Sequence, residues 1–216
     1  MQRLLPAAAA CAELRGAGQQ LPVHPEEAPF VAGAIPARRR EFAAARGCAR
    51  RALAELGIEP VAILPGDRRE PCWPPGVVGS LTHCTGYCAA AVAGEDEIAA
   101  LGIDAEINEV LPEGVHDSVA TSNERDLLRT LAQRDPTVCW DRVLFSAKES
   151  VYKAWYPMAR RWLGFLDVAL HIDPAAGTFT ARIVLDQTRG NRKISRLAGR
   201  WAADDGLIRT AAWLHR

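Results

Sequence analysis

The chain has 216 residues, of which 49% are hydrophobic, so it can bury the core of one large domain or two small ones. Its 26 Lys and Arg residues balance 26 Asp and Glu residues, which excludes a general basic field for holding a nucleic-acid backbone. No segment approaches the roughly 20 consecutive apolar residues of a membrane-spanning helix. We therefore expect a soluble protein that binds neither nucleic acid nor membrane.

Six cysteines would allow three disulfides, but a chain with this much core does not need them. Three occur in apolar or helical runs, so we expect reduced, buried thiols in a cytoplasmic protein. Residues 1–14 contain an alanine run that imitates a secretory signal, but the run is short and Pro6 interrupts it. We expect no signal peptide.

The clearest predicted helix of the first half covers residues 36–57. Pro36 opens it, Gly57 closes it, and an apolar stripe follows its length. Residues 60–76 hold five prolines and two glycines, a composition typical of a loop. The next three runs are rich in small and β-branched residues and predict adjacent strands of one sheet, over residues 77–81, 87–93 and 98–107.

In the second half, Thr121 or Ser122 caps a predicted helix that reaches about Gln133, and Glu124 is placed to close a capping box. A longer helix is predicted over residues 137–156, ended by Pro157. Strands follow over residues 166–172 and on both sides of an Asp-Asp-Gly turn at 204–206.

The order of elements thus recurs in the two halves of the chain without a repeat of the sequence. We predict an α+β fold of two similar halves, residues 1–105 and 106–216.

Two carboxylates stand out near the end of the third predicted strand. Asp104 and Glu106 lie two residues apart, so both project from the same face. Hard oxygen ligands of this kind suit Mg²⁺, which completes its shell with water and phosphate oxygens. A solvent-facing acidic pair without metal is the alternative.

A second acidic group occurs on the long helix. Glu149 and Lys153 lie four residues apart and therefore on one helical face. An ordinary surface ion pair, or a capping box of Ser146 with Glu149, would explain the same spacing. The apolar stripe continues through position 146, which argues against a helix start there.

His83 ends a predicted strand just before a glycine turn, where backbone amides and an imidazole could receive an anion. His83, Cys84 and Cys88 could also suggest zinc. No second pair of ligands follows at the usual spacing, so we do not expect a zinc site.

The three segments occur together and in order, as VGSLTHC, LGIDAE and FSAKESVYK. In this combination they resemble the phosphopantetheinyl transferases of the surfactin-synthetase-activating class, and more closely the branch that is similar to enterobactin synthetase component D. The resemblance covers residues 36–170 and includes an Arg-rich helix and a Pro-Gly-Asp-Arg turn. It implies a pseudo-two-fold pair of α+β halves with the active site in the cleft between them.

The resemblance also implies a reaction. Enzymes of this family move the 4′-phosphopantetheine arm of coenzyme A to a serine of an apo acyl or peptidyl carrier protein and release 3′,5′-ADP. A monomer with an internal pseudo-dimer is implied, with the carrier docked along the cleft.

Roles for individual residues follow from their match to the family's motifs. Asp104, Glu106 and Glu149 would bind Mg²⁺, or Mn²⁺ in its place. Glu149 would also take the proton from the carrier serine, and Lys153 would offset charge on the leaving group. Coenzyme A would be bound by Arg38, Arg46, Gly66, Asp67, Arg68, Thr82, His83 and Lys153, with Arg38, Arg46 and His83 on its 3′-phosphate.

One position departs from the family. Relatives can carry a lysine where this chain has Pro65. One phosphate contact is therefore missing, or Arg68 or Arg69 supplies it.

Two other functions fit parts of the pattern. A metal-dependent phosphodiesterase or nuclease would also use two acidic groups followed by Glu-x-x-x-Lys, although the neutral net charge argues against it. A non-catalytic coenzyme A-binding module would need the Arg-rich helix and His83, but not a complete set of acidic residues.

Overall fold

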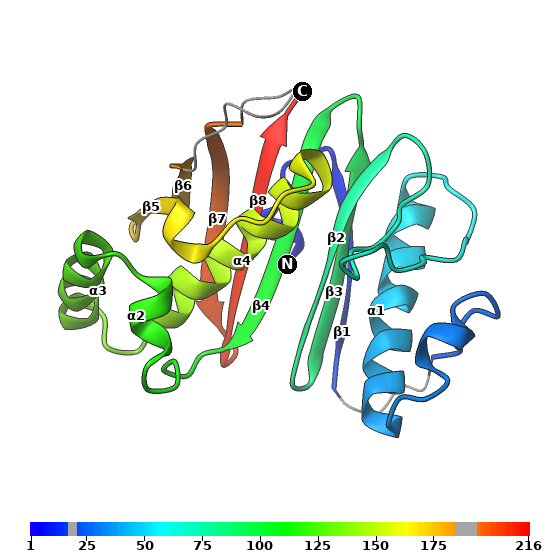
Figure 1. The fold of residues 1–216 in the computed structure, drawn as a ribbon, viewed down its shortest axis with the longest axis horizontal. Coiled ribbons are helices and arrows are strands. Elements are labelled where there is room, and N and C mark those ends of the chain that lie inside the picture. Colours follow the sequence, from blue (N-terminus) through cyan, green and yellow to red (C-terminus); the bar gives the residue numbers. More distant parts are fainter. Residues whose placement is uncertain (17–20, 185–193) are drawn as a thin grey trace.

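A computed structural model describes residues 1–16, 21–184 and 194–216 of the chain. At its centre are two antiparallel sheets (Figure 1). The first has the order β1-β3-β2 and is built from β1 (Ala9–Arg15), β2 (Val77–Cys84) and β3 (Tyr87–Gly94). The second has the order β4-β8-β7-β6-β5 and is built from β4 (Ile98–Ile107), β5 (Val168–Asp173), β6 (Thr178–Ile183), β7 (Arg196–Asp204) and β8 (Leu207–His215).

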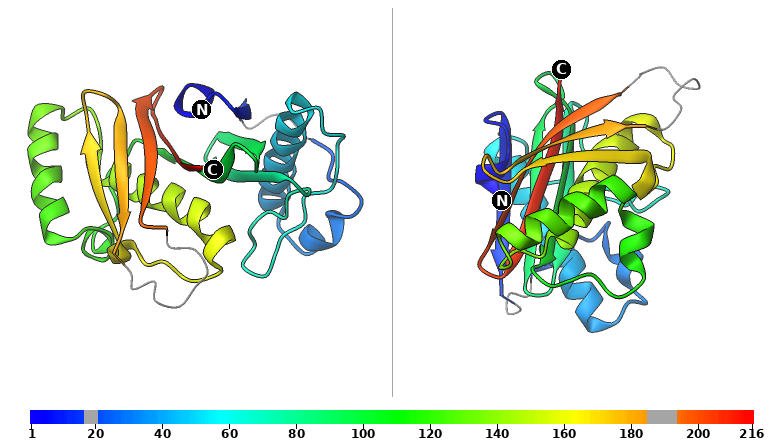
Figure 2. Two further views of the ribbon diagram at one scale, coloured as in Figure 1. Left: turned by 90° about the horizontal axis from the view of Figure 1, so that it is seen from above. Right: turned by 90° about the vertical axis from the view of Figure 1, so that its left-hand side faces the viewer.

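Helices cover both sheets. The α-helices are α1 (Pro36–Glu55), α2 (Val115–Val119), α3 (Ser122–Arg134) and α4 (Trp140–Ala159). Single 3₁₀ turns are η1 (Gln2–Leu4), η2 (Ala28–Val31) and η3 (Phe165–Asp167). Helix α1 packs on the first sheet and α4 on the second, with α1 and α3 toward opposite ends of the molecule (Figure 2). The predicted α+β fold class is confirmed.

The predicted first helix is confirmed as α1. Pro36 begins the helix, and Gly57, just beyond its end, adopts a φ of 74° that favours glycine. The predicted apolar stripe, which includes Cys48, Ala52 and Leu53, is buried against β1 and β3. The arginines on the remaining helix surface are thereby held at the side of the first sheet.

The third predicted strand, β4, belongs to the other sheet, so that part of the prediction is wrong. It pairs with β8 from Ile98 opposite His215 to Ile107 opposite Leu207. Alternation in a run of residues predicts a strand, but it carries no information about a partner more than 100 residues away. Strand β2 still lies beside β4.

The two faces of β4 contact different halves of the molecule, because successive side chains of a strand point to opposite faces. Leu101 and Ile103 belong to the apolar core that β4 and β8 share with β3 of the first sheet. Gly102 lies on the opposite face, under α4, where an added Cβ would overlap the Ser150 carbonyl oxygen. Only glycine lets α4 rest directly on this strand, and Asp104 follows on the same face.

Helix α4 has the predicted length but is displaced by three residues, since it begins at Trp140 rather than at Thr137. It passes through Pro157 and ends at Ala159, after which Arg160 has a φ of 50° and donates its N–H to the Tyr156 carbonyl (2.8 Å). A proline so near the end of a helix removes only one hydrogen bond of the last turn. The capping box at Ser146 is excluded, because Ser146 is buried in mid-helix with its Oγ 3.0 Å from Thr210 Oγ1.

Two further predictions have clear outcomes. The capping box of Thr121 with Glu124 at the start of α3 is confirmed. All six cysteines are free thiols, as expected, but only Cys48 and Cys88 are buried; Cys72 is exposed and the other three are half-buried. Within the described ranges, no helix combines the length and apolar character needed to cross a bilayer.

A buried ion pair joins α4 to the elements around it. Lys148 Nζ donates to Glu124 Oε2 (2.8 Å) and to the carbonyls of Val119 (2.8 Å) and Phe165 (2.9 Å). The other oxygen of Glu124 accepts the N–H of Leu170 (3.0 Å). This network connects α2, α3, η3 and β5 to the helix that carries Glu149 and Lys153.

We predict that Glu124→Ala lowers the free energy of unfolding by about 3–5 kcal/mol, because it leaves the Lys148 ammonium buried without its counter-ion. Chemical denaturation followed by circular dichroism measures the change. Asp126→Ala on the same helix is the matched control. It removes an exposed ion pair with Arg129, which contributes at most about 1 kcal/mol. Equal losses in the two variants would contradict a structural role for the Glu124 network.

Candidate active site

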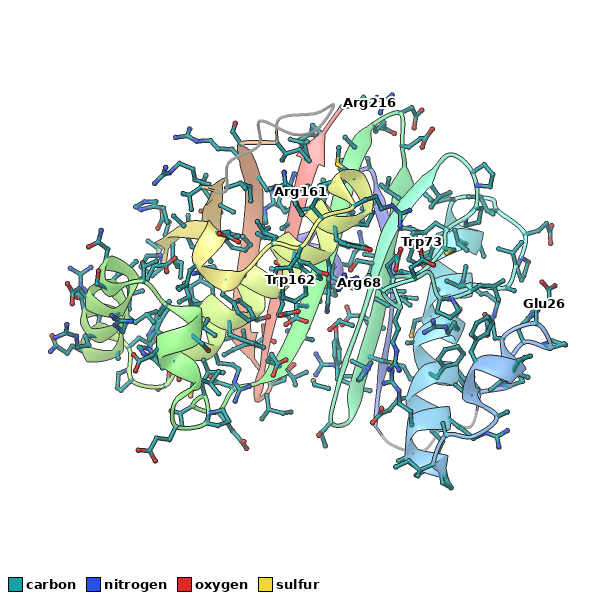
Figure 3. All side chains as sticks on the ribbon, viewed as in Figure 1. Glu26, Arg68, Trp73, Arg161, Trp162 and Arg216 are labelled. Atoms are coloured by element: carbon teal, nitrogen blue, oxygen red, sulfur yellow. The ribbon has the colours of Figure 1, made fainter. Side chains whose placement is uncertain are left out.

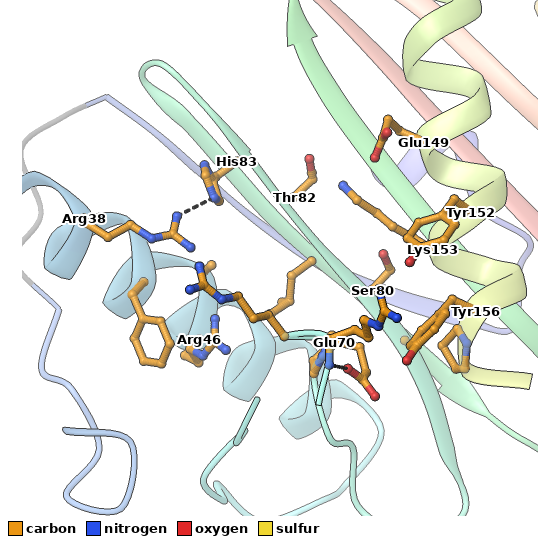
Figure 4. A pocket seen from close by; sticks show the side chains of 18 residues that line it. Arg38, Arg46, Glu70, Ser80, Thr82, His83, Glu149, Tyr152, Lys153 and Tyr156 are labelled. Atoms are coloured by element: carbon orange, nitrogen blue, oxygen red, sulfur yellow. Dashed lines mark hydrogen bonds between the residues drawn. The ribbon is translucent and has the colours of Figure 1, made fainter. Parts of the chain in front are cut away.

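A cavity of about 300 Å³ lies between the two halves, bordered by α1, β2 and α4 (Figure 4). Most of the residues predicted from the sequence line it, namely Arg38, Arg46, Arg68, Thr82, His83, Glu149 and Lys153. Arg68 lies near the middle of the molecule, between the ribbons of the two halves (Figure 3). The cavity therefore has walls from both halves of one chain.

One end of the cavity is cationic. Arg38 Nη1 lies 2.9 Å from His83 Nε2, although the two residues come from α1 and β2 (Figure 4). Arg46 is buried, its guanidinium carbon is 3.6 Å from the centre of the Phe42 ring, and its Nε donates to the Ile63 carbonyl (3.3 Å). Burial lowers the pKa of Arg46 to about 10, so it remains charged near neutral pH.

Burial lowers the pKa of His83 below its ordinary value of 6.5, and the Arg38 guanidinium lowers it further. Near neutral pH the imidazole is therefore neutral, and its Nε2 accepts the hydrogen bond from Arg38. An anion at this place would favour the imidazolium, which could then donate to it.

A buried carboxylate that the sequence did not single out supports the cationic end. Glu27 is fully buried, and its Oε1 accepts hydrogen bonds from Arg50 Nη1 (2.7 Å) and the Ile63 N–H (2.8 Å). Since the Ile63 carbonyl holds Arg46, Glu27 fixes α1, Arg46 and the following loop to one another.

The other end of the cavity approaches the acidic residues. Asp104 is buried, and its Oδ1 accepts a hydrogen bond from Lys153 Nζ (2.7 Å) and a longer one from Thr82 Oγ1 (3.4 Å). Its Oδ2 is buried without a hydrogen-bond partner among the described residues. Glu106 accepts from Arg142 Nη1 (3.1 Å).

Glu149 faces the cavity from α4, and no hydrogen bond to its carboxylate occurs in the described part of the chain (Figure 4). Burial raises the pKa of Glu149; Lys153 lowers it, and Asp104 and Glu106 raise it again. Burial also raises the pKa of Glu106, with Asp104 as the next contribution. Asp104, Glu106 and Glu149 are therefore close enough to interact electrostatically, and a bound cation would stabilise their negative charges.

These residues do not form an assembled metal cage. Among residues 1–16, 21–184 and 194–216, no group of three or more His, Cys, Asp or Glu side chains is placed to hold a metal ion. The carboxylates do fit a hard cation by their chemistry, because one buried oxygen of Asp104 has no hydrogen-bond partner among the described residues. Beyond the effect of burial, Asp104 raises the pKa of Glu106, and both of these carboxylates raise the pKa of Glu149.

Five predicted residues differ from expectation. Gly66, Asp67, Asp104 and Glu106 do not line the cavity, whereas Arg69 and Glu70, which follow the predicted turn, do line it. The hydroxyl of Thr82 is used within the protein, since it also accepts the N–H of Ala105 (3.0 Å). Thr82 thus positions the strand that carries Asp104.

Sequence reasoning missed other lining residues. Tyr152 and Tyr156 line the cavity from α4, and Ser80 lines it from β2. Tyr152 lies three residues after Glu149 on the same helical face, a spacing that would have identified it. Nothing in the local sequence signals Ser80.

A smaller cavity of about 160 Å³ is also lined by Glu149 and Tyr152. Its lining is mostly apolar and includes Trp162, Leu163 and Phe165. Glu149 and Tyr152 line both cavities, so the two spaces adjoin at these residues.

The fold and the site define an α+β protein of two halves whose shared cavity suits a phosphate-bearing ligand. Residues 26–93 match the family model of the 4′-phosphopantetheinyl transferase N-terminal domain, and residues 100–204 match that of the 4′-phosphopantetheinyl transferase superfamily. The chain belongs to the 4′-phosphopantetheinyl transferase family, and it is therefore an enzyme of the transferase type.

Three relatives support this assignment over most of the chain. The 4′-phosphopantetheinyl transferase Svp of Streptomyces mobaraensis is 54% identical over 87% of this chain and 76% of its own length. PptT of Mycobacterium tuberculosis is 47% identical over 87% of this chain and 84% of its own. Npt of Nocardia iowensis is 46% identical over 98% of each chain.

We expected a close similarity to enterobactin synthetase component D, but the similarity is only distant. Enterobactin synthase component D of Salmonella typhi is 34% identical over 55% of this chain and 48% of its own.

We predict that His83 makes stability depend on pH. Its folded pKa is lowered, so protonation favours the unfolded state. Stability is then fully present above pH 6.5 and is lost as the pH falls through the folded pKa. Between about pH 7.5 and about pH 5.5, the melting temperature of the parent should fall more than that of His83→Gln. A difference between the two proteins that does not change with pH would contradict a lowered pKa.

Proposed function

We propose that the cavity between the halves binds coenzyme A, and that the enzyme transfers its phosphopantetheine arm to a serine of an apo acyl or peptidyl carrier protein. The observation that supports this most directly is the shared cavity itself. It brings Arg38, Arg46 and His83 of the first half to the same space as Glu149 and Lys153 of the second.

The charges suggest how coenzyme A lies in the site. Its 3′-phosphate carries close to two negative charges and would be received by Arg38, Arg46 and His83. The pyrophosphate would then extend toward Lys153, the cation on α4. The uncharged arm would leave past Tyr152 toward the smaller apolar cavity. This direction places the reacting phosphorus near Glu149.

Glu149 is suited to proton transfer. Its raised pKa makes the carboxylate a stronger base near neutral pH, and it accepts no hydrogen bond from another described residue. The serine oxygen would bond to the phosphorus that carries the arm, and its proton would pass to Glu149. The bond from that phosphorus to the bridging oxygen breaks, and 3′,5′-ADP leaves with the electron pair. The Lys153 ammonium offsets the charge on this leaving group.

We further propose that Asp104, Glu106 and Glu149 hold Mg²⁺, or Mn²⁺ in its place. The bound ion would supply positive charge to the pyrophosphate and to the crowded carboxylates. Lys153 already occupies Oδ1 of Asp104, and Arg142 holds Glu106. Arg142 is anchored by further bonds to the carbonyls of Glu109 (2.9 Å) and Val110 (3.0 Å), so Lys153 is the cation that can leave.

The shared cavity also bears on the oligomeric state of the enzyme and on its division into halves. One chain supplies both walls of the cavity, which supports a monomer of the surfactin-synthetase-activating class with the carrier docked along the cleft. The division into residues 1–105 and 106–216 stays a prediction. Because β4 pairs with β8, we favour a boundary before Ile98, in the turn after β3. Six free thiols support a cytoplasmic location.

We predict that the enzyme, coenzyme A and Mg²⁺ add one phosphopantetheine arm to an apo carrier protein, and that Glu149→Gln abolishes the addition while remaining folded. Intact mass spectrometry of the carrier protein detects the added mass of one phosphopantetheine arm. The same enzyme incubated with plasmid DNA and Mg²⁺ should leave the strands intact. Normal transfer by Glu149→Gln would refute its role as base, and cut plasmid without carrier modification would favour the phosphodiesterase.

Arg46→Ala tests the 3′-phosphate end. Losing one charge-assisted hydrogen bond should weaken coenzyme A use by roughly 10- to 100-fold, mostly through KM, because the group is remote from the reacting phosphorus. Dephospho-coenzyme A lacks the 3′-phosphate and is the internal control. With it, Arg46→Ala and His83→Ala should show little further loss. Equal losses with both substrates would point to a structural role instead.

Direct metal binding tests the acidic end. Titration of Mn²⁺ without coenzyme A, followed by electron paramagnetic resonance, should show roughly 10-fold or greater weakening in Asp104→Asn and Glu106→Gln. Lys153→Gln should bind Mn²⁺ more tightly than the parent, because it removes the cation that occupies Asp104. Arg68→Gln controls for the loss of one charge elsewhere in the cavity. Weaker binding in Lys153→Gln would contradict competition for Asp104.

A further inference from the structure

A turn of the first half is attached to the end of α4 through Glu70. Its Oε1 lies 2.5 Å from Arg160 Nη1, and the Glu70 side chain is only 12% exposed. Arg160 is the residue that ends α4, the helix that carries Glu149 and Lys153. The contact therefore joins the two halves at the rim of the cavity, which Glu70 lines (Figure 4).

The turn is built around the Glu70 carboxylate. Its Oε2 accepts the N–H of Arg68 (2.9 Å), and the Glu70 carbonyl accepts the N–H of Gly66 (2.7 Å). An added Cβ at Gly66 would lie 2.6 Å from the carboxyl carbon of Glu70. Glycine at position 66 is thus required for the carboxylate to fold back under the turn.

The backbone on both sides of this contact is in an unusual conformation. Arg69 has a φ of 66° and Arg160 a φ of 50°, and in the described part of the chain only Asp205 joins them as a non-glycine residue with positive φ. Such residues persist only where the surrounding contacts hold them, and they cluster at functional sites. Neither position uses glycine, so the contacts around the turn and around the end of α4 hold both residues in this conformation.

We infer that Glu70 is a positioning residue for coenzyme A. It fixes the turn of residues 66–70 to α4, and it thereby holds Arg68 and Arg69 at the rim of the cavity, where both line it. This inference rests on the proposed function for the identity of the ligand. Arg68 and Arg69 are exposed, so without Glu70 their side chains would have to be ordered each time the ligand binds. The consequence is a loss of affinity rather than of chemistry.

The alternative is an ordinary surface ion pair, since the Arg160 side chain is 64% exposed and such pairs contribute little. The two possibilities predict different effects of removing the Glu70 carboxylate on melting temperature and on coenzyme A affinity. A surface pair would affect melting temperature slightly and coenzyme A affinity not at all. A positioning residue would affect affinity even where stability is unchanged.

The test measures coenzyme A binding by isothermal titration calorimetry and KM and kcat with an apo carrier. Glu70→Gln should raise Kd and KM for coenzyme A by roughly 3- to 10-fold, with kcat near that of the parent. Gly66→Ala should do the same without removing a charge. Arg160→Gln should have a smaller effect, and the double variant Glu70→Gln/Arg160→Gln should be no worse than Glu70→Gln alone. Glu95→Gln, an exposed acidic residue in the turn after β3, is the control.

Affinity in Glu70→Gln equal to that in Glu95→Gln would overturn the inference, as would a fall in kcat with unchanged KM. Should Glu70→Gln fail to fold, Arg160→Gln still tests the contact from its exposed side, and full affinity there would overturn the inference. A parent enzyme that does not bind coenzyme A would overturn both this inference and the proposed function. Normal binding by the parent and by Glu70→Gln would overturn this inference alone.

Discussion

A buried carboxylate, Asp104, is the constraint on which the rest of the site depends. It lies where β4 of the second sheet runs beside β2 of the first, and its neighbours Thr82 and Lys153 come from the two halves. Gly102 lets α4 lie on β4 closely enough for Lys153 to reach the carboxylate. A charge removed from water in this way must be compensated. Lys153 compensates one oxygen of Asp104, and the other has no hydrogen-bond partner in the part of the chain that the structure describes.

The two ends of the cavity therefore differ in how far the protein itself compensates their charged groups. At the cationic end, hydrogen bonds within the protein already hold the binding residues in place. The Ile63 carbonyl accepts from Arg46, and Glu27 in turn accepts the Ile63 N–H. At the acidic end, burial raises the pKa of Glu106 and of Glu149, and the neighbouring Asp104 raises both further. A ligand with a dianionic phosphate at one end and a pyrophosphate that brings a cation at the other would complement both. Coenzyme A has this distribution of charge.

Much of this arrangement could be predicted from local sequence. Pro36 and Gly57 bracket α1, and alternation along β4 places Asp104 and Glu106 on one face. Pairing of β4 with β8 could not be predicted, because the choice of partner depends on tertiary packing rather than on the strand's own pattern. The resemblance to known motifs located Arg38, Arg46 and His83, which the structure brings to one cavity. Glu70 escaped notice because its role depends on a contact with Arg160, 90 residues away.

The central claim is that one coenzyme A molecule spans both halves, with its pyrophosphate at the carboxylates and its 3′-phosphate at the arginines. Phosphorus-31 NMR of coenzyme A bound to the enzyme, with a small amount of Mn²⁺, measures this most directly, since the ion broadens the nearest phosphorus resonances most. We predict strong broadening of the pyrophosphate resonances and weaker broadening of the 3′-phosphate resonance in the parent enzyme, with both effects reduced in Asp104→Asn. Broadening of the 3′-phosphate equal to or greater than that of the pyrophosphate would contradict it.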